Sequence, residues 1–273
     1  MLNKYPIDSV YTIAEIGINH NGDLALAKKL IEWSAVVGFD SVKFQKRNPD
    51  VCVPKEQKSK KRETPWGKIT YLDYKKRVEF EEEEYDQINS WCKKLNIEWS
   101  ASPWDEDSVD FLAKYKLPWV KVPSAIINNA ALLEYIGARF KRIILSTGAA
   151  DMHMVKAAYG VLERAGAKHI DVLHCNSSYP APVEDLNLRC MQSMVETFPD
   201  SNVGYSGHEY GLTPTIATVA LGAKIIERHV TLDKGMWGSD HKCSLEPHAM
   251  IKLVRSIKAV SYTHLTLPTN REV

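Results

Sequence analysis

The sequence has no apolar run long enough to span a bilayer and no excess charge of either sign. A transmembrane helix needs about 20 consecutive apolar residues, and no stretch of the 273 residues approaches that length. The formal net charge of +1 at pH 7 gives no sign of a nucleic-acid or membrane partner. The N-terminal stretch "MLNKYPIDSVYTIAEIG" lacks the apolar core of a secretory signal. We therefore expect a cytoplasmic protein that binds neither nucleic acid nor membrane.

Cysteine is also scarce, and its spacing excludes two kinds of site. The five cysteines are odd in number and widely separated: Cys52, Cys92, Cys175, Cys190 and Cys243. They include no C-x-x-C pair of the kind that binds zinc, and they do not form the even set of a disulfide framework. Reduced thiols that fill the core of a cytoplasmic protein are the simplest interpretation.

Short β-branched or aromatic segments alternate with helical patterns along most of the chain. Eight segments have strand character: 11–17, 41–45, 97–102, 119–123, 142–146, 169–175, 202–206 and 224–230. The helical pattern "DLALAKKLIEWSAVVG" that ends at Gly38 is typical of the segments between them. Strands that alternate with helices indicate a parallel sheet. Eight such units in this length favour an α/β fold of the (β/α)8 TIM-barrel type, and a doubly wound sheet is the alternative.

One long segment, Lys46–Val78, does not fit this alternation. It is polar and has "KEQKSKKRETPWGK" at its centre. Long segments of this kind are either solvated loops or functional covers of a binding site. Both interpretations stay open: a solvated loop, or a lid over the mouth of the barrel.

Polar residues follow or end each of the eight predicted strands. In a (β/α)8 barrel, the carboxyl ends of the strands form the mouth that carries the chemistry. The residues there include Glu15, Lys43, Gln45, Ser102, Lys121, Ser124, Ser146, Asn176, Ser177, Tyr179, Ser206, His208, Glu227 and His229. The two-residue alternation of a strand places Lys43 with Gln45, and Glu227 with His229, on shared faces. We expect these faces to point into the barrel.

The residue types at the mouth indicate an anion site and a metal site. Two lysines with several hydroxyls can hold an anion, and two histidines from neighbouring strands with carboxylates nearby can hold a divalent ion. Each residue alone also has a structural explanation, since a strand-end histidine often only donates a hydrogen bond and an inward lysine often only forms a salt bridge. Their coincidence at eight independent strand ends favours the functional interpretation.

Several stretches resemble the sialic acid synthase family, which makes N-acetylneuraminate and related nonulosonates. They are "AEIGINHNGD", "VKFQKR", "ILSTG", "LHCNSSYPAPVEDLNL", "GYSGHEYG" and "IIERHVTLDK" followed by "GSDHKCSLEP". The resemblance covers about residues 11–260. It implies a metal-dependent (β/α)8 barrel that condenses phosphoenolpyruvate with an N-acetylated aminosugar such as N-acetylmannosamine and releases phosphate.

The resemblance also implies roles for individual residues. Those expected to bind phosphoenolpyruvate are Lys43, Ser102, Lys121, Ser124, Ser146, Ser177 and Ser206. Asn176 lies next to Ser177 and is a further candidate for the same role. His208 and His229 match the metal ligands, with Mn²⁺ expected and Mg²⁺ or Co²⁺ as alternatives. Glu15, Gln45, Tyr179 and Asp240 match positions that handle the sugar, and Glu15, Asp240 and His229 are the catalytic candidates. Glu227 is either a support for the metal site or a buried partner of a barrel lysine.

Family members usually continue into an antifreeze-like domain that reaches over the partner subunit of a dimer. We expect residues 1–260 to form the synthase barrel, with that second domain absent and residues 261–273, "SYTHLTLPTNREV", a non-native or disordered tail that does not continue the helical period. The full-length protein is expected to be a homodimer, and this chain alone to bind the aminosugar weakly and to be of reduced activity.

The sequence agrees less well with two other functions. A metal-dependent amidohydrolase on the same barrel requires His-x-His after the first strand, whereas "GINHNGD" has one histidine. A non-catalytic sugar- or anion-binding barrel would be favoured by loss of the histidines or lysines, and all four are present. Within the family, the sequence leaves the acceptor open between N-acetylmannosamine, its 6-phosphate and a diamino-dideoxy sugar.

Overall fold

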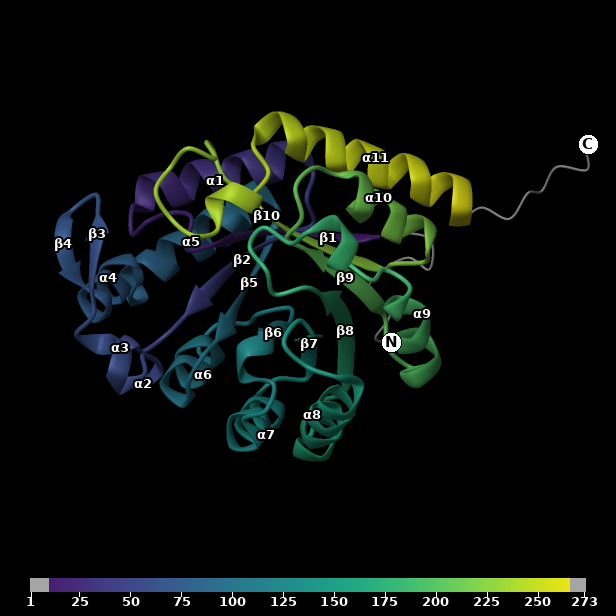
Figure 1. The fold of residues 1–273 in the computed structure, drawn as a ribbon, viewed down its shortest axis with the longest axis horizontal. Coiled ribbons are helices and arrows are strands. Elements are labelled where there is room, and N and C mark those ends of the chain that lie inside the picture. Colours follow the sequence, from purple (N-terminus) through teal and green to yellow (C-terminus); the bar gives the residue numbers. More distant parts are fainter. Residues whose placement is uncertain (1–9, 266–273) are drawn as a thin grey trace, which may run out of the picture.

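A computed structural model, in which residues 10–265 are described, has eight parallel strands, arranged as a barrel with helices outside it (Figure 1). The strands are β1 (Tyr11–Gly17), β2 (Ser41–Lys46), β5 (Glu98–Pro103), β6 (Val120–Val122), β7 (Arg142–Ser146), β8 (His169–Cys175), β9 (Val203–Gly207) and β10 (Ile225–His229). Their order in the sheet is β5-β2-β1-β10-β9-β8-β7-β6. At the seam, β5 contacts β6, and the Ser100 hydroxyl donates to the Trp119 carbonyl. The ring is therefore nearly closed, which confirms the predicted TIM barrel.

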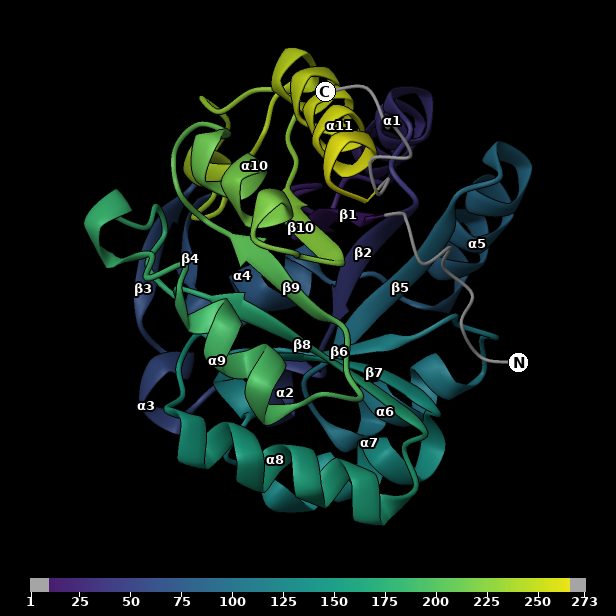
Figure 2. The same ribbon diagram turned by 90° about the vertical axis from the view of Figure 1, so that its right-hand side faces the viewer.

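Eight of the helices each follow a barrel strand in the sequence, and they cover the outside of the barrel (Figures 1 and 2). They are α1 (Leu24–Val37), α5 (Glu82–Leu95), α6 (Glu106–Ala113), α7 (Ala130–Arg139), α8 (Met152–Ala165), α9 (Cys190–Thr197), α10 (Thr213–Ala220) and α11 (Pro247–Leu265). Helix α1 shows how the sequence sets their ends. The Asp23 side chain accepts from the backbone N–H groups of Ala25 and Leu26, and Gly38 ends the helix at φ 91°, a conformation that costs glycine little.

Segment 46–78 is folded, so its interpretation as a plain solvated loop is wrong. It contains three short helices and a hairpin: α2 (Pro49–Cys52), α3 (Lys55–Lys58), β3 (Lys61–Thr64), β4 (Gly67–Thr70) and α4 (Tyr71–Val78). Trp66 and Tyr74 pack edge-on against Trp237, with ring centroids 5.9 and 5.1 Å away. A Cβ atom on Gly22 would lie 2.2 Å from the carbonyl oxygen of Arg77. The segment is thus docked on the loops that follow β1 and β10, whereas its use as a lid stays a prediction.

The barrel interior is apolar at its floor and charged above it. A buried cluster at the floor consists of Tyr11, Ile13, Trp119, Ile144, Leu173 and Ile225. Two residues further along their strands, the same inward faces carry Glu15, Lys121 and Glu227, because side chains alternate with a period of two. The larger core between the strands and the outer helices is separate from this interior. The fold therefore supports a layer of ionisable groups on an apolar plug.

The C-terminal helix runs further than the sequence pattern predicts. Helix α11 continues to Leu265, so the expectation that the helical period stops at Val260 is wrong for these five residues. Residues 266–273 of the expected tail lie outside the described residues. The division into a barrel domain and a tail stays a prediction.

The described residues also bear on the cysteines and on membrane binding. Within residues 10–265, all five cysteines are free thiols. Cys92, Cys175 and Cys243 are buried, as predicted, but Cys190 is exposed and Cys52 is half-buried, because they lie on α9 and α2 at the surface. No helix in this part of the chain has the length and apolar character needed to cross a membrane.

Candidate active site

A cavity of about 280 Å³ opens at the carboxyl ends of the strands. All eight barrel strands, or the loops that follow them, contribute to its wall. The lining residues are Glu15, Lys43, Gln45, Ser102, Trp104, Lys121, Pro123, Ser124, Ala125, Ser146, Ala149, Cys175, Ser177, Tyr179, Ser206, His208, Glu227 and His229. Every predicted site residue except Asn176 and Asp240 is among them. The structure thus brings the other predicted residues together at one mouth.

At the floor of the cavity, two lysines alternate with two carboxylates. Lys43 Nζ lies 2.7 Å from Glu15 Oε2 and 3.9 Å from Glu227 Oε1. Lys121 Nζ lies 2.5 Å from Glu227 Oε1. All four side chains are buried, so these interactions are little screened by solvent. Glu227 is therefore a buried partner of both barrel lysines, one of the two roles left open for it, and its support of the metal site stays a prediction.

The two carboxylates differ in acidity because their surroundings differ. Burial acts to raise the pKa of Glu227, but the charges of Lys121 and Lys43 outweigh it and lower this pKa to about 2. Burial raises the pKa of Glu15 to about 7, although Lys43 partly opposes the rise. Glu227 therefore stays ionised at neutral pH, whereas Glu15 can take up and release a proton there.

Hydroxyl groups extend this charged layer toward the rest of the wall. Lys43 Nζ donates to Ser102 Oγ over 3.2 Å, and Lys121 Nζ donates to Ser206 Oγ over 3.3 Å. The hydroxyls of Ser124 and Ser177 lie 3.2 Å apart on the facing side. Each lysine has three N–H donors. An anion that enters this mouth thus meets both ammonium groups and several hydroxyl donors.

Two imidazoles face each other across the neighbouring ends of β9 and β10. The ring centroids of His208 and His229 are 5.3 Å apart. His208 Nδ1 lies 2.6 Å from the carbonyl oxygen of Asn176. Since a carbonyl oxygen only accepts, Nδ1 carries a proton and donates it, which in the neutral ring leaves the lone pair on Nε2. Histidines that bind metal in proteins are commonly held in this way.

The second imidazole is deeply buried and incompletely bonded. His229 Nδ1 has no hydrogen-bond partner among residues 10–265, and Asp240 Oδ2 is 3.9 Å away. Burial lowers the pKa of His229 to about 4, even though Asp240 opposes the shift, so the ring is neutral at pH 7. A neutral ring with an unsatisfied nitrogen suits a metal ligand.

The separation of the two rings is compatible with one shared ion, given metal–nitrogen bonds of about 2.0–2.2 Å. Within the described part of the chain, His, Cys, Asp and Glu side chains form no group of three that could hold a metal. The two histidines would therefore supply two ligands of a divalent ion, and its other ligands would have to come from outside this pair.

Aromatic and acidic side chains complete the outer part of the mouth. The Tyr179 ring stacks on His208 at a centroid distance of 4.0 Å and meets His229 edge-on at 5.8 Å. Asp240 lies just outside the cavity lining. Although burial opposes it, the neighbouring His229 and the Ser239 hydroxyl hold the pKa of Asp240 below its ordinary value.

Asn176 is the predicted site residue that the structure places elsewhere. Its Oδ1 accepts from the Ser178 N–H, and its Nδ2 donates to the Asp185 carbonyl. These bonds keep the side chain in the turn after β8, in the wall of a neighbouring cavity. Only its backbone carbonyl oxygen contacts a residue of the site, because it accepts the hydrogen bond from His208 Nδ1.

Cys175 and Trp104 line the cavity but were not predicted. The signal for Cys175 was present in the strand alternation, because it lies two residues after the inward-facing Leu173. Its Sγ lies 3.6 Å from His208 Nδ1. Trp104 follows β5, outside any strand pattern, and nothing in its local sequence indicated its position.

A ring of eight parallel strands with paired lysines, carboxylates and two imidazoles at its carboxyl ends defines a (β/α)8-barrel enzyme. Residues 30–265 match the NeuB family. The chain belongs to this family of phosphoenolpyruvate-dependent nonulosonate synthases, which confirms the resemblance seen in the sequence.

Similar proteins differ in the sugar that their names specify. The chain is 37% identical over 264 residues to N-acetylneuraminate-9-phosphate synthase of Drosophila melanogaster, which covers 96% of this chain and 71% of that protein. It is 42% identical over 252 residues to N,N'-diacetyllegionaminic acid synthase of Campylobacter jejuni, which covers 91% of this chain and 75% of that protein. These similarities identify the family, but they do not identify the sugar that accepts phosphoenolpyruvate.

Solved structures of other proteins share the barrel fold of this chain. The crystal structure of N-acetylneuraminic acid synthetase from Leptospira borgpetersenii, in complex with citrate, has a TM-score of 0.86 and 29% identity, and the match covers 96% of this chain and 88% of that one. A truncated 3-deoxy-D-arabino-heptulosonate 7-phosphate synthase from Thermotoga maritima has a TM-score of 0.71 at 13% identity, which is a likeness of fold.

Proposed function

We propose that this protein condenses phosphoenolpyruvate with an N-acetylated aminosugar, N-acetylmannosamine or a relative, to give a sialic-acid-type nonulosonate and phosphate. The observation that carries the proposal is the convergence of Lys43 and Lys121 in one buried layer below the two imidazoles of His208 and His229. This arrangement offers cationic donors to a small, highly charged substrate and a separate polar wall to a second one.

Phosphoenolpyruvate is proposed to bind at the floor. Lys43 and Lys121 each keep a carboxylate partner, and a remaining N–H of each ammonium group is directed to the phosphate or carboxylate of the substrate. The proposed hydroxyl donors are Ser102, Ser124, Ser146, Ser177 and Ser206. Asn176 is left out of this set because its side chain is bonded within its own turn.

The aminosugar is proposed to bind at the outer part of the mouth, against Gln45, Tyr179 and Asp240. Glu15 lies between this wall and Lys43. Because burial raises the pKa of Glu15 to about 7, the Glu15 carboxylate is suited to accept a proton from the attacking water and to donate it to the product. Asp240 is the second candidate for proton transfer at the sugar hydroxyls.

His208 and His229 would hold the divalent ion, with Mn²⁺ favoured by the family resemblance and Mg²⁺ or Co²⁺ as alternatives. Such an ion, when bound, supplies Lewis-acid polarisation of a carbonyl oxygen. The chain prepares for it through the Asn176 carbonyl, which fixes the His208 tautomer, and through burial, which keeps His229 neutral.

The proposed reaction forms one carbon–carbon bond and breaks one carbon–oxygen bond. The phosphoenolpyruvate methylene carbon attacks the aldehyde carbon of the open-chain sugar, and water adds to the phosphate-bearing carbon. Collapse of that adduct expels phosphate together with the bridging oxygen. The lysines stabilise the anionic groups throughout, and much of the rate is expected from holding two substrates in reactive proximity.

The direct test is a panel of acceptors assayed for phosphate release and for the nine-carbon product. N-acetylmannosamine, its 6-phosphate and a diacetamido-dideoxy sugar are each added with phosphoenolpyruvate and Mn²⁺. One acceptor should release phosphate with matching product. With the bridging oxygen of phosphoenolpyruvate labelled, the label should appear in phosphate. Retention of the label in the sugar, or no turnover of any acceptor, would overturn the proposal.

A further inference from the structure

Arg47 lies directly behind the wall of the mouth. It follows β2 and is only 8% exposed. Its guanidinium group lies over the Trp104 ring, 4.2 Å from the ring centroid, and its Nη2 donates to Gln45 Oε1. Trp104 and Gln45 both line the cavity. Arg47 thus contacts two residues that line the cavity but does not line it itself.

The contact with Arg47 fixes which way the Gln45 amide faces. A guanidinium group has five donors and no acceptor, so only the carbonyl end of the amide can face it. The amino end then points the other way, and Gln45 Nε2 donates to Glu15 Oε1 over 2.9 Å. The reversed amide would turn its amino group toward the guanidinium donors and its oxygen toward the Glu15 carboxyl group.

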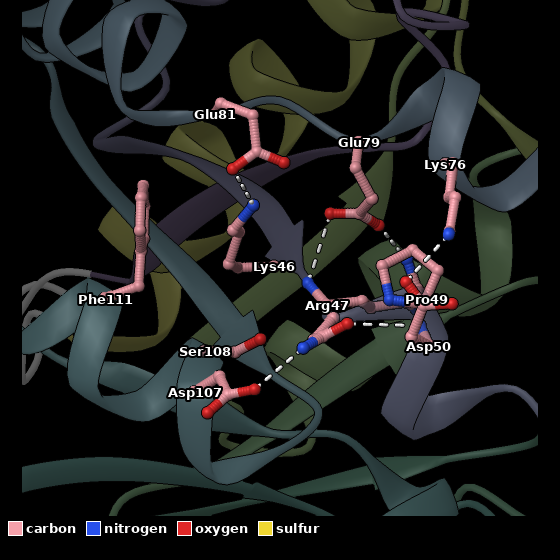
Figure 3. Close-up of a pocket in the computed structure, with 11 residues that line it drawn as sticks. Lys46, Arg47, Pro49, Asp50, Lys76, Glu79, Glu81, Asp107, Ser108 and Phe111 are labelled. Carbon is pink, nitrogen blue, oxygen red and sulfur yellow. Dashed lines mark hydrogen bonds and ion pairs between the residues drawn. The ribbon is translucent and has the colours of Figure 1, made fainter.

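Arg47 is itself held from outside the mouth. Glu79 Oε2 accepts from the Arg47 backbone N–H over 3.1 Å, and Glu79 Oε1 lies 3.6 Å from Arg47 Nη1 (Figure 3). Both side chains are almost fully buried. They line a second cavity, of about 480 Å³, formed with α2, α4 and α6. Glu79 thus accepts a hydrogen bond from the backbone of Arg47 and places a carboxylate oxygen near its guanidinium group, in surroundings that are closed to solvent.

We propose that Arg47 is a positioning residue for the acceptor sugar: it sets the orientation of the Gln45 amide and thereby the hydrogen-bonding wall that the aminosugar meets. The inference rests on the proposed function for the identity of the acceptor. Arg47 acts through Gln45, so its effect should depend on Gln45 being present and should leave phosphoenolpyruvate binding unchanged.

The experiment is a double-mutant cycle on Arg47 and Gln45. Arg47→Met should raise KM for the aminosugar roughly tenfold or more, the size expected for loss of a hydrogen bond to a charged group. In the Gln45→Ala background, the same change should add less than about twofold, since coupled residues are not additive. Arg47→Lys should recover part of the loss. Calorimetry should show the phosphoenolpyruvate Kd within about twofold of wild type, well under the tenfold step expected for one such bond.

Arg62→Met is the matched control. Arg62 is an exposed arginine of segment 46–78 whose guanidinium lies 4.2 Å from the Tyr71 ring centroid, and its loss should leave KM unchanged. Full additivity of Arg47→Met and Gln45→Ala, or an unchanged KM in Arg47→Met, would overturn the inference. If Arg47→Met does not fold, Glu79→Gln replaces it: a rise in KM that disappears in Gln45→Ala supports the role, and an unchanged KM overturns it.

The inference can also fail separately from the proposed function. If the wild-type protein turns over no aminosugar, the proposed function fails, and crystal structures of the wild type and Arg47→Met still decide the role of Arg47. A Gln45 amide in the same orientation in both structures would overturn it, and a reversed or disordered amide in the variant would support it.

Discussion

Arg228 and Glu209 form an ion pair that is completely shielded from solvent, with Arg228 Nη1 3.0 Å from Glu209 Oε1. Glu209 follows His208 in the chain, and Arg228 precedes His229. Arg228 also donates to the Glu209 carbonyl and to the Thr215 hydroxyl. Arg228 and His229 are consecutive in β10, so alternation along the strand sends the imidazole into the barrel and the guanidinium group outward. The pair therefore joins the two chain segments that carry the imidazoles.

Glu209→Ala should lower the free energy of unfolding by about 3–5 kcal/mol, because it leaves a buried guanidinium without its counter-charge. Urea denaturation followed by circular dichroism measures this change. Asp110→Ala is the control, since Asp110 forms a more exposed pair with Arg139, and pairs of that kind contribute about 0–1 kcal/mol. Equal losses for the two variants would contradict the prediction.

Lys43→Ala and Lys121→Ala should each weaken phosphoenolpyruvate binding by roughly 10–100-fold, the size expected for loss of a charge-assisted hydrogen bond. Affinity for the uncharged aminosugar should be largely kept. Calorimetry with each substrate separately measures both effects. Lys76→Ala, which removes an exposed lysine paired with Asp50, should change neither. Unchanged phosphoenolpyruvate affinity in both site variants would argue against the role.

Removal of either mouth histidine should abolish binding of the divalent ion. His208→Ala and His229→Ala each leave one imidazole, and a single nitrogen ligand holds such an ion weakly. Titration with Mn²⁺, followed by calorimetry, should show binding by the wild type that is lost in both variants, and a chelator should stop turnover of the wild type. His153→Ala, on the exposed surface of α8, is the control. Tight Mn²⁺ binding by both site variants would place the ion elsewhere.

His20 should make the protein less stable as pH falls below neutrality. Burial lowers the pKa of His20 to about 3 in the folded state, against 6.5 for the ordinary group. The unfolded chain therefore binds the proton first, and stability is lost as pH falls from about 6.5 toward 3. Between pH 7.5 and 5.5, this linkage amounts to about 1.4 kcal/mol.

The measurement compares urea denaturation of wild type and His20→Asn at these two pH values. Asparagine keeps an acceptor for the Gly22 N–H, which His20 Nδ1 now accepts over 3.1 Å. The variant should show a smaller drop in stability, by about 1 kcal/mol, and His153→Asn should behave like the wild type. An identical drop in His20→Asn and wild type would show that His20 does not carry this dependence.

The strands and their inward faces could be predicted from the sequence because both depend on local alternation. Burial on one face of a strand fixes which residues point into the barrel, so Lys43, Lys121 and His229 could be placed at the mouth in advance. Glu227 could be named as a candidate partner of a barrel lysine, but which lysine each carboxylate contacts could not be predicted. Lys121 and Glu227 lie 106 residues apart, and only closure of the barrel brings β6 across from β10.

Other features depend on contacts that no local pattern encodes. Segment 46–78 lacks a continuous apolar face of its own and packs through Trp66 and Tyr74 onto a distant loop, so its sequence resembled a loop. The inward or outward direction of Asn176 is set by a turn after the strand, where alternation no longer applies. Such positions need the three-dimensional structure.

The docking of segment 46–78 on Trp237 has a mechanical consequence. Trp237 lies three residues before Asp240, and Asn21 of the β1–α1 loop donates to its carbonyl over 2.9 Å. Parts of the chain that are far apart in sequence are thereby interlocked along one side of the mouth. A displacement of the hairpin would be transmitted through Trp237 to the loop that bears Asp240, so segment 46–78 and the loops that follow β1 and β10 would move together on this side of the mouth.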